Sequence, residues 1–369
     1  CSSDNEEITT DPIPTGTISG EITTAESYPK GNYTIQGTVK VKNGGSLTIE
    51  AGSVITAVLT DGSDALLVEN GGKLFLNGTA ALPIVFTEAS KTPGSWGGII
   101  MVGDAPIVGA NSVTTATTED GNNLPYGGTN ATHNGGTLKY VRVEYAGKKL
   151  TDNTSEMNGF SFYSVGSGTV LENLVAYKGA DDGFEFYGGT VSAKNLISYG
   201  NFDDSFDWQD GWRGDDNTNW YAYQVVTGNY GMEIEAKSIN NAFGPKVSNI
   251  TLTRAAGTVT EGGSSANEFD AIQFKKEGNG EYTNVVISGY TTSNTTLTAT
   301  AVRIQDKSTN DNQVTGGKIK MLNVKINDGT SQFAGVGTTF TVAFPTGNYT
   351  TSTTATGATL TAGAWAIVD

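Results

Sequence analysis

Two pairs of adjacent aspartates occupy matching positions of a repeated segment and could together bind a metal ion. The segment around residue 180 recurs 22 residues later with the same order of Asn, Tyr, Asp-Asp and aromatic residues. Carboxylate oxygens at this density suit Ca²⁺, which takes six to eight oxygen ligands in flexible geometry. The spacing is not that of an EF-hand, and the alternative is that each aspartate caps its own turn through a hydrogen bond to the backbone. The predicted metal ligands are Asp181, Asp182, Asp203, Asp204 and Asp207.

A row of polar residues is predicted along one face of the strands next to these aspartates. Several short segments read apolar-polar-apolar, so the central side chain points away from its two neighbours. Carboxylates stacked one strand spacing apart, about 4.8 Å, repel by about 3.5 kcal/mol at an effective dielectric constant of about 20. A cation, a basic neighbour or a raised pKa would offset the repulsion, and the alternative is a solvated acidic surface. The central residues are Ser161, Glu185, Asp207, Glu233, Gln273 and Arg303.

The same row supplies the candidate catalytic residues. Glu185, Asp207 and Glu233 could act as acids, and three basic residues lie on later coils of the same face: Arg303, Lys275 and Lys276. General acid-base chemistry needs such paired groups within reach of one substrate.

Aromatic residues that follow the acidic segment are candidates for ligand binding. Indole and phenol rings can pack on the apolar faces of sugar rings, or they can pack an inserted loop onto the strands. Together with the carboxylates, the predicted ligand-binding residues are Glu185, Asp207, Glu233, Trp212, Trp220 and Tyr221.

The elements that must position these residues are the coils of a solenoid. A repeat period in the twenties with two or more short strands per repeat is typical of a β-solenoid, in which each repeat adds one coil. The chain has 369 residues, of which 49 are glycine, and shows no convincing helix of three turns. This favours all-β structure with many tight turns. We predict a single-stranded right-handed parallel β-helix with a capping C-terminal segment, because parallel crossovers favour the right hand.

The charge of the chain excludes several classes of partner. The formal net charge of −16 argues against nucleic acid and against anionic membrane surfaces. No run of 18 apolar residues is present, so no membrane-spanning helix is expected. The chain also lacks a phosphate-binding glycine loop and a recognisable Ser/His/Asp arrangement.

Three regions are expected to depart from the regular repeats. The polar residues 1–20 are predicted to be a flexible tether, and the β-helix domain is expected to cover residues 21–369. Residues 104–136 are poor in apolar side chains and are predicted to be a long insertion over the coils, with the only histidine, His133, exposed to solvent. Residues 335–369 are expected to cap the open end of the solenoid.

Asparagine recurs at one position of the later repeats. Side-chain amides stacked from coil to coil can hydrogen-bond to one another and satisfy buried turn carbonyls, so a structural role inside the solenoid is predicted. The residues are Asn173, Asn195, Asn249, Asn284 and Asn323.

The only cysteine is the first residue, Cys1, and polar and acidic residues follow it. A lone cysteine excludes an intrachain disulfide. This start resembles that of mature bacterial lipoproteins, in which the signal peptide is removed before a lipid-modified cysteine, and the acidic residues resemble the surface-export signal of Bacteroidetes lipoproteins. The alternative is a boundary that falls at a cysteine by chance. The resemblance implies that Cys1 carries lipid and that the protein lies at the bacterial outer membrane, faces the exterior and touches the membrane only through that anchor.

Several sequence segments carry a resemblance to one family. They are Gly-Gly-Ser-Leu-Thr-Ile-Glu-Ala-Gly at 44–52, Pro-Ile-Val-Phe-Thr at 83–87, Trp-Gly-Gly-Ile at 96–99, and the Asp-Asp segments at 181–186 and 203–208. Together they resemble a family of Bacteroidetes outer-surface lipoproteins that are similar to right-handed parallel β-helix proteins of the pectate-lyase type. The resemblance covers nearly the whole chain and implies the fold, but it names no activity.

Glycan-degrading enzymes with parallel β-helices resemble this layout in part. Polygalacturonases use outward aspartates that include an Asp-Asp pair, and pectate lyases combine acidic Ca²⁺ ligands with an Arg or Lys base. The Gly-His-Gly motif of polygalacturonases is absent here, and Val-Arg-Ile-Gln at 302–305 departs from the Arg-Ile-Lys motif of pectate lyases. These departures weaken the enzyme interpretation.

Three functions remain open from the sequence. The preferred one is a surface-displayed lipoprotein that binds a glycan or another extracellular ligand on the outward face of the β-helix, assisted by Ca²⁺. An acidic surface would repel a uronate polymer unless a cation bridged the two. The alternative is a polysaccharide lyase or glycoside hydrolase that acts through the carboxylate row, and the second alternative is a structural or adhesive surface protein. The expected partner is a polysaccharide or a cell-surface ligand.

Overall fold

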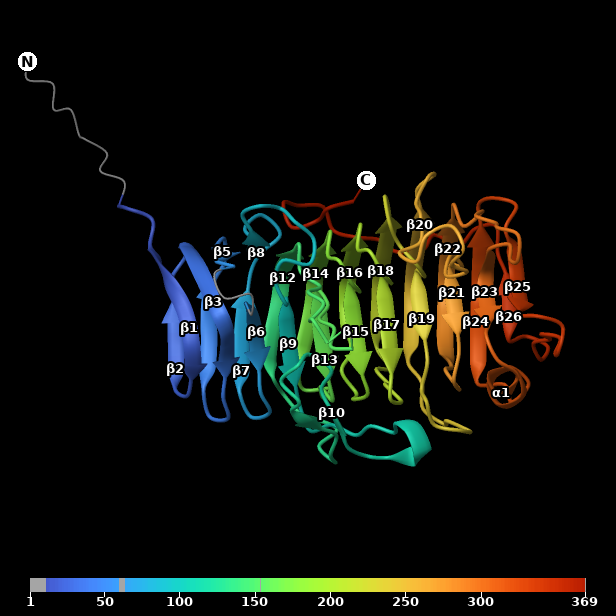
Figure 1. Ribbon diagram of the computed structural model, residues 1–369, viewed down its shortest axis with the longest axis horizontal. Helices are drawn as coiled ribbons and strands as arrows, with labels where there is room; N and C mark the ends of the chain where they lie inside the picture. The colour runs from blue at the N-terminus through green and yellow to red at the C-terminus, as the bar shows by residue number, and fades with distance from the viewer. Residues whose placement is uncertain (1–10, 60–63, 153, 369) are drawn as a thin grey trace, which may run out of the picture.

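The chain winds into one elongated solenoid of parallel strands (Figure 1). The computed structural model describes residues 11–59, 64–152 and 154–368. In these ranges 24 strands pair in parallel from coil to coil, and a separate antiparallel pair, β10 (Ala116–Thr117) and β11 (Pro125–Tyr126), lies in a loop. The predicted parallel β-helix is confirmed, and the arrangement is consistent with the right-handed coil expected for such crossovers.

Each coil contributes to three sheets that run along the solenoid. The first sheet contains β2 (Ala25–Tyr28), β4 (Ser46–Glu50), β7 (Lys73–Asn77) and the first halves of β12 (Gly136–Glu144), β14 (Val170–Tyr177), β16 (Ala193–Tyr199), β18 (Asn217–Gln224), β20 (Lys246–Arg254), β22 (Gly280–Ser288) and β24 (Ile319–Ile326). The second sheet contains the first halves of β1 (Thr15–Ile22) and β3 (Asn32–Val41), then β5 (Val54–Ala57), β8 (Ile84–Glu88) and the second halves of the long strands, ending at β26 (Tyr349–Thr351). The third sheet contains the ends of β1 and β3, then β6 (Ala65–Val68), β9 (Ile99–Val102), β13 (Phe160–Tyr163), β15 (Phe184–Tyr187), β17 (Phe206–Gln209), β19 (Met232–Ile234), β21 (Ile272–Phe274), β23 (Thr300–Ile304) and β25 (Ser331–Gly335).

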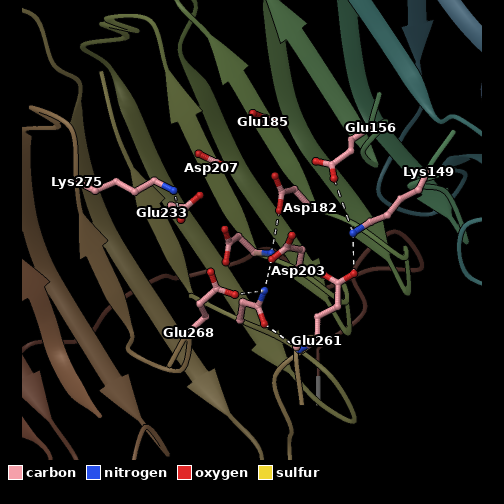
Figure 2. Close-up of a pocket in the computed structure, with 13 residues that line it drawn as sticks. Lys149, Glu156, Asp182, Glu185, Asp203, Asp207, Glu233, Glu261, Glu268 and Lys275 are labelled. Carbon is pink, nitrogen blue, oxygen red and sulfur yellow. Dashed lines mark hydrogen bonds and ion pairs between the residues drawn. The ribbon is translucent and has the colours of Figure 1, made fainter. Parts of the chain in front are cut away.

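The third sheet aligns the predicted polar row in register. Glu185 in β15 pairs with Asp207 in β17, and the same position continues through the strands on either side. Because side chains alternate between the two faces of a strand, the residues at this position stack on the outer face. Figure 2 shows three of them, Glu185, Asp207 and Glu233. The aligned residues, in order along the solenoid, are Ser161, Glu185, Asp207, Glu233, Gln273 and Arg303.

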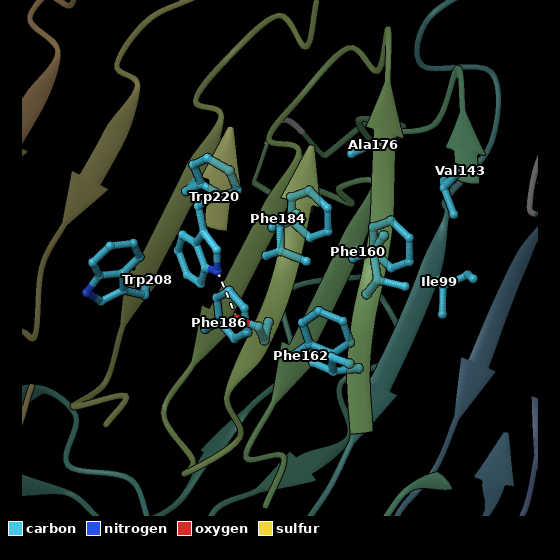
Figure 3. Packing of buried hydrophobic residues seen from close by; sticks show 14 of the residues in the cluster. Ile99, Val143, Phe160, Phe162, Ala176, Phe184, Phe186, Trp208 and Trp220 are labelled. Atoms are coloured by element: carbon cyan, nitrogen blue, oxygen red, sulfur yellow. Dashed lines mark hydrogen bonds between the residues drawn. The ribbon is translucent and has the colours of Figure 1, made fainter. Parts of the chain in front are cut away.

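Aromatic residues that flank the row point inward and fill the core. The rings of Phe160 and Phe184 stack with centroids 4.9 Å apart (Figure 3). Those of Phe184 and Phe206 stack at 5.6 Å. Trp208 and Trp220 continue the cluster, and both are buried. Stacked rings add to the stability that comes from burying their apolar area. The core therefore gives the outward row a rigid support.

The long strands bend between the first and second sheets at one residue with left-handed backbone conformation. That residue is asparagine in several coils, for example Asn195 with φ 59° and Asn219 with φ 57°. Asparagine tolerates this conformation better than most residues. The side-chain amide of Asn219 donates to Asn195 Oδ1 at 3.1 Å, and that of Asn284 donates to Asn249 Oδ1 at 2.7 Å. The predicted amide ladder is confirmed in part. Amide–amide bonds link Asn173, Asn195 and Asn219, a residue not predicted, and they link Asn249 with Asn284, but Asn249 donates to Thr218 and so interrupts the ladder.

The C-terminal region covers the last coil and then runs back along the second sheet. Phe333, Phe344 and Tyr349 pack against the end of the core. From about residue 352 the chain returns toward the N-terminal coils, and Trp365 N–H donates to Ala80 O at 3.1 Å (Figure 1). Residues 352–367 are called the strap below. The cap at the open end is therefore shorter than the expected residues 335–369, and no strand forms at residues 339–344 or 364–368.

Two other expectations change with the structure. β1 begins at Thr15, so the solenoid starts earlier than the expected boundary at residue 20, and Cys1 lies outside the described residues. Residues 103–135 leave the coils between β9 and β12, and they contain the short 3₁₀ helix η1 (Ala110–Ser112). His133 in this segment is only 4% exposed, and its Nδ1 accepts a hydrogen bond from Gly166 N–H at 3.2 Å. The expectation of a solvent-exposed His133 is wrong, because the loop folds down onto neighbouring turns.

Helical structure is confined to short pieces. The longest runs from α1 (Lys307–Thr309) into the π-helical turn η2 (Asn310–Val314) beyond β23. Within the described ranges, no helix is long and apolar enough to cross a membrane.

Candidate functional site

A groove of about 510 Å³ lies over the third sheet at β15, β17 and β19 (Figure 2). Its floor is the outward row, represented by Glu185, Asp207 and Glu233, and one wall is formed by the turns that precede β15 and β17. The loop that carries Glu261 and Glu268 extends the same side of the groove, because the side-chain amide of Asn229 donates to both Asp203 and Glu268 (Figure 2). Nine of its lining residues are acidic and two are lysines, so the groove disfavours an anionic ligand unless a cation is present.

The two aspartate pairs converge at the wall of this groove. Asp181 and Asp182 occupy the turn before β15, and Asp203 and Asp204 occupy the equivalent turn before β17. One carboxylate oxygen from each of Asp181, Asp182 and Asp203 lies within 4.8 Å of the others, and the same holds for Asp182, Asp204 and Asp207. The structure therefore brings together all five predicted metal ligands.

Some of these carboxylates also cap turns, but not their own. Asp182 Oδ1 accepts the backbone N–H of Asp204 at 2.9 Å, and Asp204 Oδ1 accepts the N–H of Tyr230 at 2.7 Å. Each aspartate thus caps the turn of the following coil, which fixes the carboxylate in place. One oxygen of each group is used in this way, and the other remains for a ligand.

Two carboxylate oxygens at the site have no hydrogen-bond partner although they are buried. They are Asp181 Oδ2 and Asp207 Oδ1. Asp181 is only 1% exposed. A buried carboxylate oxygen without a partner is costly, and a bound cation is one way to remove that cost. The donor set, which consists of hard oxygens, and these two oxygens fit Ca²⁺.

Burial and mutual repulsion shift the proton affinities of the aspartates. Burial is the largest cause, and neighbouring carboxylates add to it, so the pKa of Asp182 and the pKa of Asp204 lie well above their usual range. Burial, with Glu261 close by, raises the pKa of Asp203 to about 7. The protein without metal therefore favours protonated carboxyl groups here, and a divalent cation would compete with those protons.

The floor of the groove is held by neighbouring polar groups. Glu185 accepts hydrogen bonds from Asn158 Nδ2 at 2.8 Å and from the Tyr187 hydroxyl, and burial raises its pKa well above the usual range. Glu233 forms an ion pair with Lys275, whose Nζ lies 2.7 Å from Glu233 Oε1. Two of the three offsets considered from the sequence are therefore present: a basic neighbour at Glu233 and a raised pKa at Glu185.

Comparison with models of protein families identifies the fold family. The model described as pectate-lyase like beta helix domain matches residues 16–367. The chain belongs to this family. Comparison with curated proteins and with solved structures gave no match. Membership in the family supports a carbohydrate-related or surface role and specifies no ligand.

In this pectate-lyase-like protein, the basic residues near the groove are poorly suited to remove a proton. Carboxylates around Lys275, chiefly Glu233, raise its pKa above the usual value despite burial, which alone would lower it. The same is true of Lys149, where Asp181 and Glu261 outweigh burial. Both ammonium groups are thus held in the charged form, which stabilises nearby anions but does not accept a proton.

Arg303, proposed as a catalytic residue, is committed elsewhere. Its Nη2 lies 3.0 Å from Asp270 Oδ1, and the guanidinium also donates to the backbone oxygens of Thr298 and Gly335. The side chain is 3% exposed. Arg303 occupies the predicted position in the row, but its proposed catalytic role is wrong because it is consumed in a buried ion pair.

The aromatic residues proposed to bind ligand do not line the groove. Trp212 is 1% exposed and Trp220 is 0% exposed, and both indoles lie in the core. Their Nε1 atoms donate to the backbone oxygens of Val191 and Ala193, each at 3.0 Å. Tyr221 lies in β18 on the second sheet, in a cluster with Trp365. The prediction that these three residues stack on a ligand in the groove is wrong.

Several groove residues were missed from the sequence because loops supply them. Lys149 approaches from the loop after β12, with Nζ 3.9 Å from Asp181 Oδ1 and 2.6 Å from Glu261 Oε1. Asn229 donates to Asp203 from the turn before β19, and Glu268 comes from the loop before β21. These loops carry no repeat pattern. The only signal in the sequence was the pair of acidic residues, Glu261 and Glu268, that bound the 261–268 segment.

Proposed function

We propose that this protein binds a glycan in the acidic groove through a divalent cation, most suitably Ca²⁺. The observation that carries the proposal is the convergence of five aspartates at the groove wall, with two buried carboxylate oxygens that lack hydrogen-bond partners. The groove belongs to a pectate-lyase-like β-helix, a family that supports a carbohydrate-related or surface role.

A cation would change what the groove can bind. Without it, nine acidic residues repel acidic sugars, and neutral sugars meet a strongly hydrated surface. A bound divalent ion becomes the largest local charge and offers coordination sites to sugar hydroxyl and carboxylate oxygens, which are hard ligands of the type that Ca²⁺ prefers.

The neighbouring part of the third sheet offers room for more of the same ligand. A second depression of about 550 Å³ shares Glu233, Glu268 and Lys275 with the groove. Farther along, it is lined by amides, and Gln273 Nε2 donates to Gln305 Oε1 at 2.9 Å. Amides and an apolar residue such as Leu297 suit an uncharged polar ring better than they suit an anion.

Binding is favoured over lyase cleavage because none of the basic side chains described near the groove is free to accept a proton. Lys149 and Lys275 are held protonated, and Arg303 is buried in its ion pair with Asp270. One feature favours the alternative of a glycoside hydrolase: burial raises the pKa of Asp207 well above its usual range, and a protonated carboxyl could serve as a general acid. A structural or adhesive surface protein is the second alternative.

A glycan array probed with the protein in Ca²⁺ and in chelator tests the proposal. We expect glycan binding to fall by at least about 10-fold in chelator, and by a similar factor in Asp207→Asn, since loss of one ligand weakens metal sites on that scale. The matched control is Asp216→Asn, because Asp216 lies on the same coils, is 74% exposed and pairs with Lys194 away from the groove. Glycan binding that is unaffected by chelator would contradict the role of the cation.

The same samples separate the alternatives. New reducing ends or unsaturated uronate absorbance that disappear in Asp207→Asn would favour the enzyme, and a blank array would favour a structural or adhesive protein.

We also propose that Cys1 carries a lipid that anchors the protein to the outer membrane of a bacterium, with the groove facing the exterior. Mass spectrometry of the N-terminal peptide from native membranes tests this, and an unmodified Cys1 would contradict it.

A further inference from the structure

We propose that the aspartate cluster binds two divalent cations, with Asp182 as the ligand that bridges them. The first cation would lie between Asp181, Asp182 and Asp203, and the second between Asp182, Asp204 and Asp207. The inference deepens the proposed function, because it rests on the use of a cation at this groove.

The geometry divides the five carboxylates into two sets that share one member. In each set, one oxygen from every residue lies within 4.8 Å of the others, and Asp182 is the only residue common to both. Oxygens that bind the same Ca²⁺ at 2.3–2.6 Å can lie at most about 5 Å apart. Each set therefore matches one coordination sphere, and the five residues do not form a single set.

The hydrogen bonds of Asp182 leave it free to bridge. Only its Oδ1 accepts a backbone N–H, that of Asp204, which fixes the plane of the carboxylate. Asp182 lies between the paired turns of two coils, so its carboxylate borders both sets. Its 6% exposure leaves it buried at the wall of the groove.

Each set contains one buried oxygen that lacks a partner. Asp181, whose Oδ2 lacks a partner, is a member of the first set, and Asp207, whose Oδ1 lacks a partner, is a member of the second. The side chain of Asp181 is 2% exposed, so solvent does not compensate it. A single cation would satisfy one of these oxygens and leave the other unpaired, whereas two cations satisfy both.

Charge balance also favours two ions. Lys149 is the only lysine paired with these aspartates in the described residues, and its Nζ is closer to Glu261, at 2.6 Å, than to Asp181, at 3.9 Å. Lys275 is engaged by Glu233. One divalent cation would leave three of the five negative charges, whereas two leave one, which Lys149 shares. The repulsion between stacked carboxylates is reduced accordingly.

Two adjacent cations would present their open coordination positions to the groove from the same wall. A ligand with two oxygens on one ring, such as a carboxylate beside a hydroxyl or a pair of neighbouring hydroxyls, could bind both ions at once. The ligand class is therefore an oxygen-rich sugar held at two points.

The test is the number of Ca²⁺ ions bound per chain, measured by equilibrium dialysis and by native mass spectrometry with Ca²⁺ as the only probe. We expect two ions for the unaltered protein, one for Asp181→Asn, one for Asp207→Asn and none for Asp182→Asn at concentrations that saturate the others. The control Asp216→Asn should bind two. Circular dichroism and the melting temperature in chelator confirm that each variant is folded before its ions are counted.

The outcomes separate this inference from the proposed function. One ion or none in the unaltered protein overturns the inference, and so does an Asp182→Asn variant that still binds one ion. If one ion binds and glycan binding depends on it, the proposed function stands and the pair of ions is wrong. If two ions bind and no glycan does, the pair is right and the proposed ligand is wrong.

Discussion

The second and third sheets are built from the same coils, but the stacking of repeated side chains is favourable on the second sheet and unfavourable on the third. On the second sheet, identical residues interact favourably: the rings of Tyr177 and Tyr199 lie 5.3 Å apart, and those of Tyr199 and Tyr223 lie 5.2 Å apart. On the third sheet, Glu185 and Asp207 are paired directly in register with raised pKa values. A solenoid places like beside like, which stabilises rings and amides and destabilises charges.

The difference indicates that the second sheet mainly contributes to stability, whereas the third sheet forms the candidate functional site. The second sheet is covered by the strap and has its ladder amides bonded to each other and to the strap, as where Asn284 Oδ1 accepts Thr356 N–H at 2.8 Å. The third sheet leaves charged groups at an open groove. An unfavourable arrangement persists only where the rest of the fold over-determines it, and such arrangements cluster at functional sites.

The largest effect should come from the strap. Trp365→Ala tests whether packing on the second sheet contributes to stability without affecting the groove on the third sheet. Trp365 is 1% exposed, its ring meets Tyr140 edge-on at 5.6 Å, and its Nε1 donates to Thr361 O at 3.0 Å. Truncating a buried Trp costs about 3–5 kcal/mol of unfolding free energy. We expect a melting temperature lower by several degrees, measured by calorimetry, with unchanged affinity for Ca²⁺.

The control for the strap is Val368→Ala, since Val368 is 49% exposed and should be nearly neutral. If Trp365→Ala melted at the normal temperature, the strap would be dispensable. If it weakened Ca²⁺ binding as well, the two sheets would be coupled and the division proposed above would be wrong.

Much of this comparison was predictable from the sequence because it rests on side-chain alternation. The apolar-polar-apolar triplets determine which residues stack outward, and the 22-residue offset brings Asp182 and Asp204 to equivalent turns. Alternation also predicts that the Trp220 side chain points inward, because Trp220 pairs with Leu196 and Ile250, which occupy inward positions of the neighbouring coils. The position of Trp220 in the strand, and not its aromatic character, therefore determines that its indole packs in the core.

Other features could not be predicted because they depend on loops and on long-range packing. The sequence around Arg303 does not indicate that Asp270 is its partner. Asp270 lies in the turn before the neighbouring strand and forms an ion pair with the Arg303 guanidinium. The position of Lys149 depends on the loop that follows β12. The return path of the strap has no repeat pattern, since it contacts residues far away in sequence: 72 residues separate Thr356 from Asn284, and 140 separate Thr359 from Asn219.

A second prediction concerns the pH dependence of the unfolding free energy, which the buried carboxyl groups of the third sheet should cause. In the folded protein without metal, the pKa of Asp203 is raised to about 7, whereas an unfolded aspartate has a pKa of about 3.9. The folded state therefore binds a proton more tightly than the unfolded state. This stabilisation is fully present below about pH 4 and is lost as the pH rises toward 7, at up to about 1.4 kcal/mol per pH unit for each such carboxyl.

Adding Ca²⁺ should reverse that loss, because the cation replaces the protons as the counter-charge. We expect the increase in melting temperature on adding Ca²⁺ to metal-free protein to be larger at pH 8 than at pH 5, as measured by differential scanning fluorimetry. Asp203→Asn should flatten the pH profile of the metal-free protein between these values. An equal response to Ca²⁺ at both pH values would contradict the assignment of the protons to this cluster.

The smallest effect concerns single positions of the amide ladder, and it sharpens the contrast between amide and carboxylate. Asn219 has φ 57°, donates to Asn195 Oδ1, and accepts Thr359 N–H at 3.2 Å. Asn219→Ala should cost about 1–2 kcal/mol, because alanine is strained in the left-handed conformation and the bond to the strap is lost. Asn219→Gly removes the same bonds without the strain, so it should cost less than Asn219→Ala. The opposite change on the third sheet, Asp207→Asn in metal-free protein, should raise stability by about 1 kcal/mol at neutral pH. The amide removes the cost of protonating this carboxyl, or of ionising it beside other carboxylates, on folding. Urea denaturation of the three variants measures all these differences. If Asp207→Asn destabilised the metal-free protein as much as Asn219→Ala does, the carboxylate row would be as structural as the amide ladder, and the two sheets would not differ in the way proposed.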